Sequence, residues 1–325
     1  NGGSGDLDAP DFIFSLSSGS ASLTSVTPTS INAVNLFTYE LGVGLSGTSS
    51  GETLTVNPVD DSIYDVNGNE ASTSQSNNTA TLTDLNGPMI TSVSSSTADG
   101  LYKIGEQIAI EVTVNESVVV TGTPQLTLET GATDAVVNYS SGSGSTTLVF
   151  NYTIATEDIN SDLEYQSTSA LALKGGTIKD ASGNASTITL PTLGTANSLA
   201  GNKALVVDGV VPTFMQTPST SIVNNNTYID IVLTEAVYNA SAGSGALEVA
   251  DFTLTFAQNS GNATGASISS VKQNDNVAEG SASALAGGEI VIRAFLSITG
   301  TPSGVETITI TPVNATSIYD LAGNA

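Results

Sequence analysis

Three residue types are absent from this sequence, and cationic side chains are scarce. The 325 residues include no cysteine, no histidine and no tryptophan, and only six lysines and arginines stand against 31 aspartates and glutamates. Without histidine or cysteine the chain cannot build a Ser–His–Asp triad, a thiolate nucleophile, a disulfide or a metal site with imidazole or thiolate ligands. The net charge of −25 argues against nucleic acid as a partner, because phosphate contacts require clustered lysine and arginine side chains.

Catalytic-looking patterns occur, but each lacks what its chemistry needs. The Gly-x-Ser-x-Gly pattern around Ser49 has no histidine to serve as the base. The glycine-rich segment 42–47 precedes a strand pattern, so no helix N-terminus follows to hold a pyrophosphate. The adjacent carboxylates Glu157 and Asp158 suggest a glycosidase pair, yet no tryptophan is available to line a sugar cleft. We therefore expect that the chain is not an enzyme.

Apolar residues occur in short runs that alternate with polar residues. No run approaches the roughly 18 apolar residues that a membrane-spanning helix needs, so we expect no span in this chain. Alternation with a period of two is typical of strands that bury one face, and clusters of Gly, Ser and Asn between the runs mark turns. The clearest runs are 12–16, 108–114, 148–154, 229–233, 252–256 and 290–292. The pattern predicts an all-β protein.

The same short motif ends three parts of the chain. Segment 62–69, which contains Asp-x-x-Gly-Asn, returns almost unchanged at 317–324 and in diverged form at 177–184. Segment 52–56 likewise matches 306–310. Self-similarity of this kind indicates tandem modules, in which the first and third are close relatives and the middle one is more distant.

Two junctions between modules follow one plan, a strand ending in aspartate and then a proline. Asp84 precedes Pro88 and Asp208 precedes Pro212, so the junctions lie 208 − 84 = 124 residues apart, the length of one β-sandwich. This spacing predicts a module lacking its first strands at 1–87, a complete module at 88–211 and a module lacking its last strand at 212–325. Two explanations fit modules that lack strands at the two ends of the chain. The chain is a piece of a longer repeat array, or a neighbouring chain donates the missing strands.

Several segments of the middle module resemble the bacterial immunoglobulin-like repeats of very large cell-surface adhesins. They are 105–108, 118–128, 139–144, 170–180 and 205–208. The flanking modules, with Thr-Glu-Ala-Val at 234–237, are similar to a sister type in such proteins. The resemblance implies Greek-key immunoglobulin-like sandwiches arranged as beads on a string, exported to the bacterial surface, where such arrays form stalks or filaments. It also implies calcium at module junctions.

Oxygen-bearing side chains recur at the matched turns and junctions. Calcium takes six to eight hard oxygen ligands from Asp, Glu, Asn and backbone carbonyls, so an acidic residue placed between two modules can draw ligands from both. The candidate ligands are Asp84, Asp99 and Glu116 around the first junction, Asp208, Asp230 and Glu235 around the second, and Asp65, Asn67, Asp180 and Asp320 in the turns. The alternative is that the turns are plain turns and the junction acids are solvated rim carboxylates.

These observations predict an extracellular, adhesive and structural repeat region, stiffened by calcium and bound mainly to its own neighbouring modules. Strand exchange with neighbouring chains and a cell-surface or glycan target elsewhere in the protein are further expected contacts. The alternative function is a calcium-dependent module that recognises glycans or other cells. Tyr102, Tyr139 and Tyr165 are its candidate stacking platform, unless they are half-buried tyrosines of the sandwich.

Overall fold

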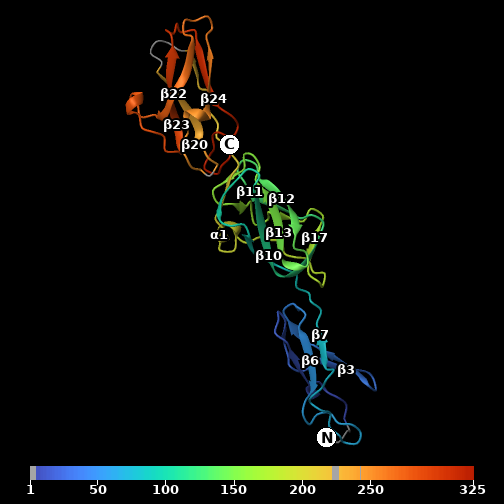
Figure 1. Cartoon of the computed structure of the whole chain (residues 1–325). Coiled ribbons are helices and arrows are strands. Elements are labelled where there is room, and N and C mark those ends of the chain that lie inside the picture. Colours follow the sequence, from blue (N-terminus) through green and yellow to red (C-terminus); the bar gives the residue numbers. More distant parts are fainter. Residues whose placement is uncertain (1–4, 222–226, 242) are drawn as a thin grey trace.

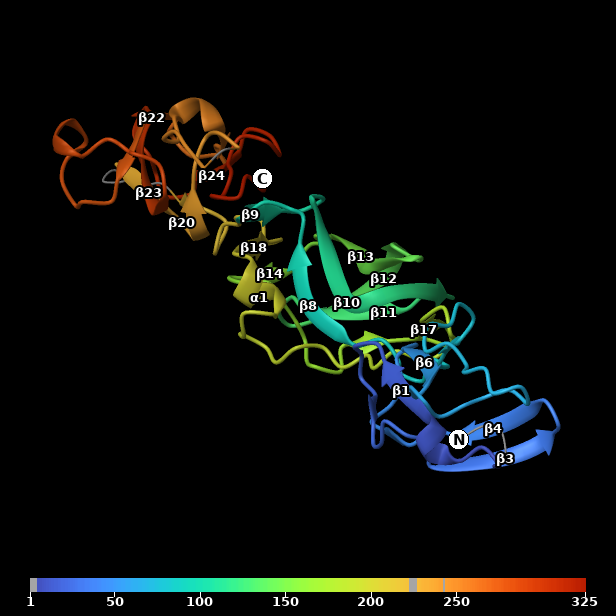
Figure 2. The same cartoon turned by 90° about the horizontal axis from the view of Figure 1, so that it is seen from below.

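The computed structural model describes residues 5–221, 227–241 and 243–325. The chain is nearly all-β, with 45% of residues in strands and 4% in helix, which confirms the predicted class. Figures 1 and 2 show three β-rich bodies in an elongated row, with the N-terminus at one end and the C-terminus beside the junction of the last two. We name these bodies the first module (up to residue 87), the middle module (88–211) and the third module (212–325).

The first module consists of small sheets with few buried apolar side chains. Strands β1, β6 and β7 form one sheet in the order β1-β6-β7, β2 pairs with β5, and β3 pairs with β4. The elements are η1 (Ala9–Asp11), β1 (Phe12–Leu16), β2 (Ser22–Leu23), β3 (Ser30–Asn35), β4 (Thr38–Gly42), β5 (Leu45–Ser46), β6 (Thr53–Pro58) and β7 (Thr79–Thr81). Within its described residues, the buried hydrophobic side chains are Phe14, Ala21 and Leu54.

The middle module has the largest core, built around one long strand. Along β10 the alternate residues Ile108, Ile110 and Val112 are fully buried, and each lies opposite a buried residue of the neighbouring strand β13, as Ile110 does opposite Phe150. Each such side chain contributes about 1.5 to 3 kcal/mol on burial. The elements are β8 (Ile90–Ser95), β9 (Gly100–Lys103), β10 (Gln107–Thr121), β11 (Gln125–Glu129), β12 (Ala135–Ser141), β13 (Ser145–Thr153), β14 (Ile159–Asn160), β15 (Glu164–Tyr165), β16 (Leu171–Ala172), β17 (Thr177–Lys179), α1 (Leu199–Asn202) and β18 (Leu205–Asp208).

The third module packs two three-stranded sheets, ordered β19-β24-β21 and β20-β23-β22. Ile231 and Leu233 of β20, Ile292 of β23 and Ile310 of β24 meet in its core. The elements are β19 (Ser219–Ser221), β20 (Tyr228–Val237), η2 (Val249–Asp251), β21 (Phe252–Ala257), β22 (Gly265–Gln273), η3 (Glu279–Ser281), β23 (Glu289–Thr299) and β24 (Thr307–Pro312).

The first and third modules share their local architecture down to strand register. Phe12 pairs with Pro58 between β1 and β6, and Phe252 pairs with Pro312 between β21 and β24. A buried glutamate precedes β6 and β24, and it accepts the backbone N–H of an alanine at 2.8 Å in the first module and 2.7 Å in the third. Burial by itself would raise the pKa of Glu306, but hydrogen bonds from backbone amides outweigh burial and hold the pKa at about 2.

Candidate metal centres at the module junctions

The Asp-x-x-Gly-Asn motif folds into the same closed turn in all three modules. In each turn the aspartate backbone N–H donates to the asparagine carbonyl oxygen, at 2.8, 3.1 and 3.0 Å in chain order. The asparagine returns two hydrogen bonds, from its backbone N–H and its side-chain Nδ2, to the two carboxylate oxygens at 2.7 to 2.8 Å. The turns are Asp65–Asn69, Asp180–Asn184 and Asp320–Asn324.

The second and third turns also hold the chain that links two modules. Asn184 Nδ2 lies 3.2 Å from the carbonyl oxygens of both Asp84 and Asn86. Asn324 Nδ2 donates in the same way to the carbonyl oxygens of Asp208 at 2.8 Å and Val210 at 3.3 Å. Each asparagine therefore fastens the linker that enters its own module.

The linkers themselves adopt matching conformations. Asp84 Oδ1 accepts the backbone N–H of Asn86 at 3.0 Å, and Asp208 Oδ1 accepts that of Val210 at 3.2 Å. These are Asx turns, in which a short acidic side chain satisfies the amide two residues ahead. Each turn occupies one carboxylate oxygen of the linker aspartate and leaves the other oxygen for a further ligand.

Each junction gathers three carboxylates from the two modules that meet there. Oxygen atoms of Asp84, Glu116 and Asp180 lie within 4.8 Å of one another at the first junction, and those of Asp208, Glu235 and Asp320 do so at the second. In both groups a linker aspartate comes from the preceding module, while a strand glutamate and a turn aspartate come from the following one. Asp180 and Asp320 are buried.

The glutamate of each group has a raised pKa, to which the neighbouring negative charges contribute. Burial, followed by the charges of Asp208 and Asp320, raises the pKa of Glu235 to about 7. Burial followed by Asp180 and Asp84 likewise raises the pKa of Glu116. One carboxylate oxygen of Glu235, Oε1, is buried and has no hydrogen-bond partner among the described residues. A buried acceptor beside two further carboxylates fits a cation with oxygen ligands.

Four of the predicted ligands lie outside these groups. Asp99 pairs with Lys203 at 3.1 Å, and Asp230 pairs with Arg293 at 2.7 Å. These are the two ion pairs within the described residues, so neither carboxylate group holds a lysine or arginine partner there. The remaining two, Asp65 and Asn67, lie in the exposed first turn and belong to neither group of three carboxylates.

Reasoning from the sequence overlooked the asparagines as linker clamps, although they recur in every copy of the motif. The second junction has two more clamps that no motif marks. The backbone N–H of Ile104 donates to Asn324 Oδ1, and Lys103 Nζ donates to the carbonyl oxygen of Gly323, both at 3.0 Å. The side-chain hydrogen-bonding capacity of Asn324 is therefore filled by groups from both modules.

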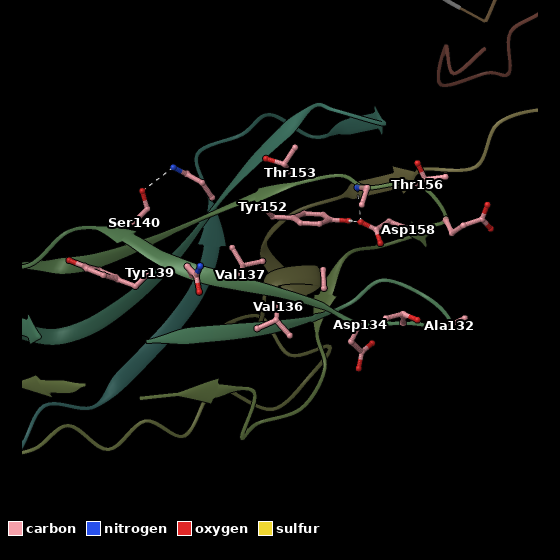
Figure 3. Close-up of a pocket in the computed structure, with 16 residues that line it drawn as sticks. Ala132, Asp134, Val136, Val137, Tyr139, Ser140, Tyr152, Thr153, Thr156 and Asp158 are labelled. Carbon is pink, nitrogen blue, oxygen red and sulfur yellow. Dashed lines mark hydrogen bonds between the residues drawn. The ribbon is translucent and has the colours of Figure 1, made fainter. Parts of the chain in front are cut away.

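The middle module carries a groove lined by residues of β12, β13 and the loops that flank them (Figure 3). It encloses about 760 Å³ where β12 and β13 diverge, since these strands pair only at Tyr139 with Phe150 and at Ser141 with Val149. Polar side chains line it, among them Asn138 and Asn151.

The predicted tyrosine platform is not assembled. The Tyr165 ring is fully buried and its hydroxyl donates to the carbonyl oxygen of Pro191, so Tyr165 is a tyrosine of the sandwich core and has no face available to stack on a ligand. Tyr102 donates to the carbonyl oxygen of Ala98, and Tyr139 packs edge-on against Phe150 with ring centroids 6.0 Å apart. Of the three tyrosines, Tyr139 alone lines the groove.

No helix among the described residues combines the length and the apolar character that crossing a membrane requires. Comparisons of the chain with protein-family models, with curated proteins and with solved structures found no match.

Proposed function

We propose that this chain is a stretch of an extracellular stalk or filament of a bacterial surface protein. It is built from tandem immunoglobulin-like Greek-key sandwiches, and a divalent cation, which we assign as calcium, stiffens each junction. The observation that carries this proposal is the repetition of one arrangement, because Asp84, Glu116 and Asp180 at the first junction have the same roles as Asp208, Glu235 and Asp320 at the second.

The chemistry of the donor set supports the choice of a hard cation. All side-chain donors in both groups are oxygens, which suit Ca²⁺ and do not suit metals that prefer thiolate or imidazole. A dication between the carboxylates would offset the repulsion that raises the pKa of Glu235. Because its ligands come from both modules, the ion would resist bending at the linker and keep the row of sandwiches extended.

The direct test is calorimetric titration of the full chain with calcium. We expect two sites per chain, with affinities in the range of about 0.1 to 1 mM that extracellular calcium modules show. Glu116→Gln should remove one site and Glu235→Gln the other, since each substitution deletes a carboxylate from one group only.

Asp60→Asn is the matched control, because it removes one negative charge from an exposed position outside both groups. It should leave both sites intact. The cation proposal fails if the unaltered chain takes up no calcium, or if Asp60→Asn weakens binding as much as the two glutamine variants do.

The groove between β12 and β13 favours one second candidate, a calcium-dependent module that binds glycans. Its amide side chains at Asn138 and Asn151 and the half-buried ring of Tyr139 are groups that bind sugar hydroxyls and sugar faces. Binding on a glycan array that Asn151→Ala or Tyr139→Ala abolishes would support this function. An array without signal in the presence of calcium would exclude it for the glycans displayed.

A further inference from the structure

The middle module joins its two neighbours through opposite ends of its sandwich (Figures 1 and 2). Pro88 lies at the entry end, where its carbonyl oxygen accepts the backbone N–H of Thr187 at 2.8 Å. Gly209 lies at the exit end, where it donates to the carbonyl oxygen of Asp158 and accepts the backbone N–H of Glu157. A pull between the first and third modules therefore acts on the middle module along the line between these two ends.

The strands next to the two linkers run along this line. β10 begins near the exit end, where Gln107 pairs with Thr153, and β8 is antiparallel to it. β10 ends near the entry end, where Thr121 pairs with Thr177. β18 ends at Asp208, directly before the exit linker, and β9 is parallel to β18. β8, β9 and β18 therefore all point from the entry end to the exit end.

Tension along this line loads two strand pairs in shear. β8 pairs with β10 from Ile90 to Ser95, and β9 pairs with β18 from Gly100 to Lys103. The entry linker pulls β8 and β9 back toward the first module, while the exit linker pulls β18 toward the third module. Ladder hydrogen bonds cross between neighbouring strands, so sliding one strand past another strains all of them together, whereas peeling breaks them one at a time.

From this geometry we infer that β8 and β9, held by β10 and β18, form a mechanical clamp. With it the middle module carries tension between its two neighbours without unfolding. Such a clamp presupposes the proposed stalk, which transmits tension, but it depends on strand register and not on a cation.

Side chains fasten the clamp at the level where β8 gives way to β9. Asn202 Nδ2, just before β18, donates to the carbonyl oxygen of Val93 in β8 at 2.9 Å. Asp99, just before β9, accepts the backbone N–H of Ala204 and pairs with Lys203, both at 3.1 Å. These contacts tie the segment that leads into β18 to both strands on the entry side, so neither strand slides without breaking them.

The ladder between β9 and β18 can be weakened by one bond. The backbone N–H of Gly100 donates to the carbonyl oxygen of Ala204 at 3.0 Å. Because the amides of a strand point to alternate sides, the N–H of Tyr102 also points to β18. Tyr102→Pro therefore removes one donor of the clamp. Tyr102→Ala is the matched control, since it deletes the same side chain and keeps the N–H.

The test stretches single molecules of the full chain in EGTA between two engineered cysteines, which are unique attachment points because the chain has none of its own. Leu85→Cys with Met215→Cys, both at exposed positions, applies the force through the two linkers. Ala98→Cys with Ala196→Cys, also exposed, applies it to the segments before β9 and β18 and peels the adjacent starts of these strands apart.

At equal force the molecule held through its linkers should unfold at least about tenfold more slowly than the molecule held at the second pair of cysteines. Chemical denaturation should give the same midpoint for both, because the direction of pulling does not alter equilibrium stability. In the linker geometry Tyr102→Pro should unfold about fivefold faster than Tyr102→Ala.

Equal unfolding rates in the two pulling geometries would overturn the clamp, and this comparison needs no substitution within the clamp strands. Equal rates for Tyr102→Pro and Tyr102→Ala would also contradict it. Because EGTA removes divalent cations, either outcome is separate from calcium binding at the junctions, which the calorimetric titration tests.

Discussion

At the scale of single residues, the asparagine that closes each repeated turn has a different structural task in different modules. Asn324 is buried and bonds to both modules at its junction, whereas Asn69 is exposed and bonds within its own turn. The same motif is thus a local turn in one place and a clamp on the linker in another. This difference permits an internal comparison of two chemically identical substitutions.

Asn324→Ala should lower the free energy of unfolding of the third module by about 2 kcal/mol, because it removes a buried side chain that donates to two partly buried carbonyl oxygens of the linker. Asn69→Ala should cost only about 0.5 kcal/mol, since its groups remain accessible to water. Denaturant unfolding monitored by tyrosine fluorescence measures both. Equal losses for the two variants would contradict the clamp.

A second residue-scale prediction concerns pH. The pKa of Glu235 is raised to about 7 in the fold, so the folded third module holds a proton that the unfolded chain has already released above pH 4.5. Its stability without calcium should therefore fall as pH rises from 5 to 7 and level off above that. Melting temperatures measured in EGTA check this, and Glu235→Gln should remove most of the slope. A melting temperature that rises over this range would contradict the assignment.

The sequence predicted the acidic junctions but not which acids meet there. Matched motifs singled out Asp84, Asp208 and the turn aspartates, because repetition is visible in one dimension. Asp99 and Glu116 were equal candidates at the first junction. Strand register decides which of the two joins the carboxylate group. It places Glu116 in an irregular stretch of β10 beside the linker, and it places Asp99 next to Lys203. Register arises from tertiary pairing, so local pattern alone cannot supply it.

At the scale of elements, alternation proved a reliable guide to strands. The runs at 108–114 and 148–154 became β10 and β13, which are antiparallel neighbours in one sheet with their buried residues opposite one another. Alternation did not indicate that β9 pairs with β18 in parallel, or that β12 and β13 diverge to open a groove. These features depend on contacts between residues far apart in sequence.

Strand β10 offers a test of which of its faces stabilises the middle module. Ile110→Ala should cost about 2 to 5 kcal/mol, since it opens a cavity at a fully buried position. Val119→Ala, at a half-exposed position of the same strand, should change stability by less than about 0.5 kcal/mol. Calorimetry on the full chain would show the difference as a selective shift of one transition. Shifts of equal size would contradict the packing described.

At the scale of the whole molecule, the bodies follow one another in a row because the linkers are short and tightly held. A Cβ at Gly87 would lie 2.1 Å from the carbonyl oxygen of Ala185, and one at Gly209 would lie 2.2 Å from that of Ala155. The linker backbones therefore lie directly against the middle module at both of its ends. Hydrogen bonds set the direction of each linker, and in our proposal the junction cation limits how far it bends.

The most direct test of this account measures the distance between two modules with and without calcium. The chain has no cysteine, so Val136→Cys in the middle module and Val277→Cys in the third, both exposed, give a unique pair of spin-label sites. Double electron–electron resonance should give a narrow distance distribution with calcium and a clearly broader one in EGTA. The Glu235→Gln chain should remain broad in both conditions. Identical distributions with and without calcium would contradict the proposal that junction cations hold the modules in line.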